Sequence, residues 1–137
     1  MNHEAADLVG GWRLESWSLE YADGRPAEFP LGRDAKGMLL YTPAGPGGGW
    51  VSATLMGNAA PPASFAYAGR YAVRDGAVHH SIEVSSDPTL VGVTSTRHIA
   101  REGDRLVLSG PDFRAGTARS QRIVWRRLSA PEKTGPA

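Results

Sequence analysis

Glycines and prolines interrupt this sequence at short intervals, and this spacing constrains the fold more than any other feature. There are 17 Gly and 10 Pro in 137 residues, so the apolar segments between turns are short. Most of these segments alternate apolar and polar residues, as half-buried β-strands do. We therefore expect an all-β domain with almost no helix over residues 1–128, followed by a disordered polar tail at residues 129–137.

The clearest turn signal is Asp75-Gly76, which separates two alternating segments. Asp-Gly is a typical two-residue hairpin turn, and counting outward from it pairs Tyr71 with His80 and Tyr67 with Val84. The apolar residues of the two segments define the inward face: Tyr67, Tyr71, Val73, Val78, Ile82 and Val84. His80 has the same phase, so we expect it to point inward beside Tyr71.

The number and order of the expected strands indicate the architecture. Eight short strands in sequential hairpins favour an eight-stranded up-and-down antiparallel barrel, whose closure removes the exposed sheet edges. A barrel of this size holds one small ligand. A two-sheet sandwich is the competing architecture. In the first expected strand, alternation puts Trp12 and Trp17 on opposite faces, although both are candidates for the inward face. A bulge near Ser16 would let both side chains point into the barrel.

The segment Gly10-Gly11-Trp12 resembles the G-x-W element that opens the first strand of lipocalins. In that superfamily the Trp closes the barrel floor and an Arg of the last strand packs across it, so the resemblance assigns this contact to Arg126 or Arg127. More specifically, the chain resembles the lipocalin-like domain family of small free-standing calycin-type barrels from Val9 to Leu128. The matching segments are GGWRLESW, DGRPAEFPLGRDAKGMLLYTPAG, YAGRYAVRDGAVHHSIEVSSDPTLVG, GDRLVLS and IVWRR. The resemblance implies a barrel with a pocket but no particular reaction.

A polar patch is expected inside this barrel. The alternation of the segment 93–101 turns Ser95 and Arg97 inward. One register places Arg97 opposite His80, and a shift of two residues places it one pair away. In either register Tyr71, His80 and Arg97 form one patch, which either recognises a ligand or holds the wall together through internal hydrogen bonds.

The first functional hypothesis is that the barrel binds a small hydrophobic or aromatic metabolite. Arg97 would pair with a carboxylate or phenolate, and Tyr67 and Ser95 would line the pocket. Phe29 and Leu31 lie in a long turn-rich loop, where they would cap the barrel mouth.

Two further hypotheses remain open from the sequence. The barrel could be a cofactor-free isomerase, cyclase or dehydratase acting on a polyketide-like molecule. In that case His80 would be the general acid or base, Tyr71 the donor to a developing oxyanion and Arg97 the electrostatic clamp. Alternatively, side chains fill the barrel completely and it serves as an interaction module.

Several partners are not expected. The formal net charge is +1 and the basic residues are scattered, so we expect no nucleic-acid partner. No apolar run approaches the ~20 residues of a membrane span, and the first residues do not resemble a secretory signal, so we expect a cytoplasmic protein. The four tryptophans are expected in the core and at the barrel ends: Trp12, Trp17, Trp50 and Trp125. The sequence does not predict an oligomeric state.

We also expect neither a metal site nor a cofactor. The chain has no cysteine, which excludes disulfides and thiolate ligands. His79 and His80 are adjacent on a strand and point to opposite faces, so they do not chelate one ion together.

Overall fold

A computed structural model describes residues 4–58, 63–112 and 116–128, so the expected tail at 129–137 lies outside the described residues. Each strand is antiparallel to the next, and β1 pairs with β8 to close the barrel. The strands are β1 (Gly10–Tyr21), β2 (Lys36–Tyr41), β3 (Gly49–Met56), β4 (Ser64–Arg74), β5 (Ala77–Ser85), β6 (Thr94–Glu102), β7 (Arg105–Asp112) and β8 (Gly116–Arg127). Short 3₁₀ turns form η1 (Ala5–Asp7) and η2 (Pro88–Leu90). The predicted eight-stranded up-and-down barrel is confirmed, and the sandwich alternative is wrong.

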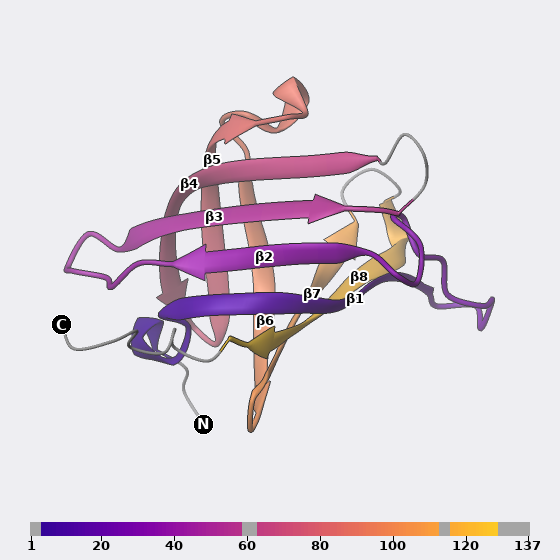
Figure 1. Cartoon of the computed structure of the whole chain (residues 1–137), viewed down its shortest axis with the longest axis horizontal. Helices are drawn as coiled ribbons and strands as arrows, with labels where there is room; N and C mark the ends of the chain where they lie inside the picture. Colours follow the sequence, from indigo (N-terminus) through magenta and orange to yellow (C-terminus); the bar gives the residue numbers. More distant parts are fainter. Residues whose placement is uncertain (1–3, 59–62, 113–115, 129–137) are drawn as a thin grey trace, which may run out of the picture.

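The two ends of the barrel differ. In Figure 1, β1, β2 and β3 lie side by side across the near wall, and β6 and β7 cross behind them. The 3₁₀ turn η1 lies beside the start of β1, at the end that we call the floor. The long loop 22–35 extends from the opposite end, which we call the mouth.

The hairpin of β4 and β5 has the predicted turn and register. Asp75 has φ 53° and Gly76 has φ 75°, so both turn residues are in the left-handed region that a two-residue hairpin of this type requires. Tyr71 pairs with His80 as predicted. The local turn chemistry therefore aligns the strands next to it.

A bulge further along this hairpin overturns the prediction for Val84. The register shifts at Gly69, so Tyr67 pairs with Ser85 rather than with Val84. One extra residue on β5 inverts the alternation, and Val84 lies on the outer surface with 66% of its area exposed. A Cβ atom on Gly69 would collide with the carbonyl oxygen of Ser81, so this position requires glycine.

A second bulge lies in β1 where the sequence predicted one. Its pairing with β8 shifts between Leu14 and Ser16. Trp12 and Leu14 are buried on one side of this shift, and Leu19 is buried on the other. The bulge therefore lets one long strand turn both of its apolar sets into the barrel.

Trp12 closes the floor, as the resemblance implied. It is completely buried, and its Nε1 donates to the carbonyl oxygen of Leu8, 2.9 Å away. The guanidinium carbon of Arg127 lies 4.1 Å from the centre of the indole ring. Arg126, the other candidate, instead donates to the carboxylate of Glu15 at 2.6 Å. The contact between the Trp and the last strand is therefore confirmed, and Arg127 is the residue that makes it.

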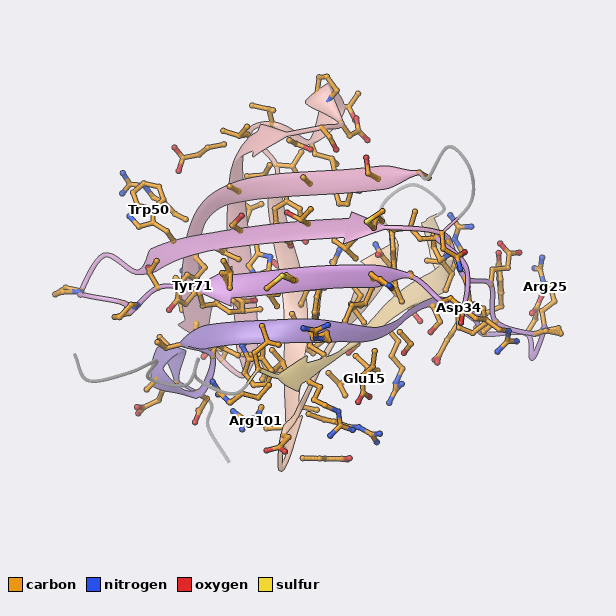
Figure 2. The ribbon with its side chains drawn as sticks, in the orientation of Figure 1. Glu15, Arg25, Asp34, Trp50, Tyr71 and Arg101 are labelled. Carbon is orange, nitrogen blue, oxygen red and sulfur yellow. The ribbon has the colours of Figure 1, made fainter. Side chains whose placement is uncertain are left out.

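Trp50 contradicts the expectation that all four tryptophans lie in the core or at the barrel ends. The alternation of β3 turns Val51 and Ala53 inward, so Trp50 projects outward from the barrel (Figure 2). Half of its surface is exposed, and the guanidinium of Arg70 lies 4.7 Å from its ring.

Replacement of Trp12 with alanine is expected to lower the free energy of unfolding by about 3–5 kcal/mol, because it removes a fully buried indole and leaves a cavity. Urea denaturation measures this loss. Trp50→Ala is the matched control, with an expected loss of about 1 kcal/mol or less, because its ring is half exposed. Equal losses in the two variants would contradict the role of Trp12 in the floor.

Candidate functional site

A cavity of about 570 Å³ occupies the barrel between the floor and the mouth. Much of its wall comes from apolar side chains on the inner faces of the strands: Trp17, Leu19, Leu39, Leu55, Phe65, Ile82, Leu108, Ile123 and Trp125. Its volume lies within the range of sites for small molecules. The cavity therefore combines a mostly apolar wall with the space for one such molecule.

The loop 22–35 contributes to the mouth of the cavity. It is held to β1 by two backbone hydrogen bonds between Leu19 and Glu28, of 2.7 and 3.0 Å. Leu31 of this loop lines the cavity. Phe29, also expected at the mouth, does not line the cavity. Its ring packs against the guanidinium of Arg33 at 4.3 Å.

A chain of hydrogen bonds crosses the deep end of the cavity. The Nε2 atom of His80 lies 2.7 Å from the hydroxyl oxygen of Tyr41, and its Nδ1 atom lies 2.8 Å from the hydroxyl oxygen of Tyr67. His80 is 1% exposed and Tyr41 is 3% exposed. His80 and Tyr67 line the cavity, whereas Tyr41 lies behind them. We call these three residues the Tyr-His-Tyr chain.

Tyr71 lies opposite His80, but its hydroxyl faces elsewhere. This hydroxyl donates to the backbone carbonyl of Thr42 at 2.6 Å, and Tyr71 does not line the cavity. Its ring instead packs edge-on against Tyr41, with the ring centres 4.7 Å apart. The structure thus places Tyr71 beneath the site, and Tyr41 is the second hydroxyl that contacts His80.

The sequence reasoning missed Tyr41. Two strands, β3 and β4, lie between β2 and β5 in the sheet, so no local turn relates Tyr41 to His80. The alternation of β2 was a usable signal. Tyr41 follows Leu39 by two residues, so the two side chains share one face of the strand, and both are buried. The curvature of the closed sheet brings the two side chains together.

Ser95 and Arg97 reach the same end of the cavity from β6. Ser95 pairs with His80, and Arg97 pairs with Val78, so the register is the one shifted by two residues. Both residues line the cavity as predicted. The Arg97 side chain passes over Gly110 of β7. A Cβ atom added to Gly110 would lie 3.3 Å from the Nη1 atom of Arg97.

The members of the Tyr-His-Tyr chain carry no charge near pH 7, and the positive charge of Arg97 lies near them. Burial, followed by the nearby positive charge of Arg97, lowers the pKa of His80 to about 3. Burial raises the pKa of Tyr67 to about 12 and that of Tyr41 well above its usual value. All three members of the Tyr-His-Tyr chain are therefore neutral near pH 7, and they offer hydrogen bonds rather than charge.

The other two histidines in the described part of the chain, His79 and His98, do not extend this site. His79 lies 3.0 Å from the hydroxyl of Thr96 through its Nδ1 atom, and His98 is exposed. Among the described residues, no three His, Asp or Glu side chains form a group that could hold a metal ion. The described part of the chain also contains no helix with the length and apolar character of a membrane span.

A closed antiparallel barrel of eight strands, with a buried floor Trp and an internal cavity, has the architecture of the lipocalin class. The lipocalin-like domain family matches residues 9–65 and 57–128, and the chain belongs to this family. We find no match among curated proteins.

Several solved structures are similar to this chain, and the two designed barrels with TM-scores above 0.5 support the fold alone. A redesigned β-barrel has a TM-score of 0.55 at 13% identity, with 94% of this chain and 98% of that chain covered. A de novo designed fluorescence-activating β-barrel has a TM-score of 0.51 at 17% identity, with 92% of this chain and 99% of that chain covered. A lipocalin-like protein from Bacteroides uniformis has a TM-score of 0.48 at 16% identity, with 89% of this chain and 99% of that chain covered.

The low pKa of His80 predicts how stability depends on pH. Between the pKa of the unfolded chain, about 6.5, and the folded value, about 3, only the unfolded chain binds the proton. The contribution of neutral His80 to the free energy of unfolding is therefore complete above about pH 6.5, and it decreases as the pH falls below that value. In urea denaturation, the free energy of unfolding of His80→Gln is expected to fall less steeply with decreasing pH than that of the unaltered protein. The expected difference in slope is about 1 kcal/mol per pH unit between about pH 6 and 4.

The exposed His98 provides the control for this measurement. His98→Gln is expected to keep the pH dependence of the unaltered protein. If His80→Gln and the unaltered protein share the same slope, the folded protein protonates His80 as readily as the unfolded chain does, and the prediction is wrong.

Proposed function

We propose that this protein binds a small, largely apolar molecule inside the barrel. The observation that carries the proposal is the cavity of about 570 Å³ with its mostly apolar wall. Burial of an apolar ligand surface there is favourable, because it removes that surface from water. Tyr67, Ser95 and Arg97 would hold the polar end of the ligand at the deep end of the cavity.

The cavity favours this function over an interaction module with a filled barrel. A barrel filled by its own side chains would leave no space for a ligand, whereas this interior retains the volume of one small molecule.

Binding is also favoured over acid–base catalysis by His80. Both ring nitrogens of His80 already contact tyrosine hydroxyls, and its pKa of about 3 makes the imidazole a weak base. A general base needs a free lone pair and a pKa near the working pH. The Tyr-His-Tyr chain therefore supports recognition of a ligand more than removal of a proton from it.

N-phenyl-1-naphthylamine tests the proposal, because its fluorescence rises when it leaves water for an apolar site. We expect saturable binding to the unaltered protein. Ala53→Phe adds a ring to the cavity wall and is expected to weaken binding at least tenfold. Thr54→Phe adds the same ring on the outer face of β3 and is expected to leave the affinity within about twofold.

Two outcomes would contradict the proposal. One is the absence of saturable binding to the unaltered protein. The other is equal affinity in Ala53→Phe and the unaltered protein, which would place the probe on the outer surface. Circular dichroism spectra and thermal midpoints of both variants would show whether each one is folded.

A further inference from the structure

The Tyr-His-Tyr chain has two possible directions of hydrogen bonding, and they present different groups to a ligand. A neutral imidazole donates from one nitrogen and accepts at the other. In the first direction, Tyr41 donates to Nε2 of His80, and the Nδ1–H group donates to the oxygen of Tyr67. In the second, the Nε2–H group donates to Tyr41, and Tyr67 donates to Nδ1. The heavy-atom distances of 2.7 and 2.8 Å are compatible with both.

The surroundings of Tyr41 distinguish these directions. Tyr41 is 3% exposed and does not line the cavity, and within the described residues His80 is the sole hydrogen-bond partner of its hydroxyl. In the second direction the hydroxyl proton of Tyr41 would be buried without an acceptor. A buried unpaired donor is costly, so the first direction is favoured by about tenfold or more.

Tyr67 does not suffer the same penalty. It lines the cavity, and across the described part of the chain its hydroxyl contacts His80 and no other hydrogen-bonding group. In the first direction the oxygen of Tyr67 accepts from His80, and its own proton is available to a molecule in the cavity. Water or a ligand there satisfies it.

We infer that the Tyr-His-Tyr chain runs from Tyr41 through His80 to Tyr67, and that the Tyr67 hydroxyl donates to a carbonyl or anionic oxygen of the bound molecule. This inference rests on the proposed function and specifies its ligand class as apolar molecules that carry such an oxygen at one end. Tyr67 is then a ligand-binding residue, and Tyr41 is a positioning residue that acts through His80.

The position of Arg97 agrees with this ligand class. Arg97 lines the deep end, and its positive charge acts on Tyr41, Tyr67 and His80. A positive potential beside a neutral hydroxyl donor favours an oxygen with negative or partial negative charge. The ligand would therefore enter with its oxygen first and leave its apolar body against the wall nearer the mouth.

The tautomer of His80 can be measured without a ligand. In ¹⁵N-labelled protein, long-range ¹H–¹⁵N correlation spectra distinguish a protonated ring nitrogen from an unprotonated one, and His80→Gln assigns the signals. We expect Nδ1 to be protonated and Nε2 unprotonated near pH 7. The reverse tautomer, or a charged ring, would overturn the inference.

Two probes with the same ring system test the ligand class. 1-Anilinonaphthalene-8-sulfonate carries an anionic acceptor that N-phenyl-1-naphthylamine lacks. Tyr67→Phe is expected to weaken binding of the sulfonate about tenfold and to leave the affinity for the neutral probe within about twofold. Tyr71→Phe is the matched control. It removes a hydroxyl bonded to Thr42 outside the cavity and should change neither affinity by more than about twofold.

The outcomes separate this inference from the proposed function. If both probes bind but Tyr67→Phe weakens them equally, or weakens neither, the inference is wrong and cavity binding stands. If neither probe binds the unaltered protein, the proposed function fails, and the ligand class inferred from it fails too. Thermal midpoints of Tyr67→Phe and Tyr71→Phe show whether an affinity change reflects a loss of folding.

Discussion

The pairing of β1 with β8 is the constraint on which the remaining structure depends. It joins the first strand of the sheet to the last, so that no edge is left unpaired and the sheet encloses a volume. The bulge between Leu14 and Ser16 keeps this pairing compatible with two apolar sets on β1. At one end of the same pair, Arg127 of β8 packs on Trp12 of β1 and closes the floor. The cavity exists because closure and floor occur together.

The polar groups inside this cavity are tolerated because they form hydrogen bonds with one another. A histidine surrounded by apolar side chains would be costly if its ring nitrogens lacked partners. Here both nitrogens of His80 contact hydroxyls from other strands, Tyr41 on β2 and Tyr67 on β4. The same bonds that satisfy the buried ring also hold the Tyr67 hydroxyl beside His80 at the cavity wall.

Local sequence rules succeeded where the structure is local. The Asp75-Gly76 turn predicted the pairing of Tyr71 with His80, and alternation predicted that His80, Ser95 and Arg97 face the interior. These rules failed for Val84, because a bulge changes which face every later residue occupies. Tyr71 was expected to act beside His80. Its hydroxyl instead donates to a backbone carbonyl below the cavity, which strand register alone does not reveal.

The sequence by itself determined the strands, their hairpin order and the inward position of the main polar groups, because turn chemistry and alternation act over a few residues. Its similarity to one family extended this to the floor contact of Trp12. The tertiary structure alone decided which hydroxyls contact His80, where the cavity lies and which side chains border it. Tyr41 and His80 are separated by two strands of the sheet, and only the curvature and closure of the barrel bring them within 2.7 Å.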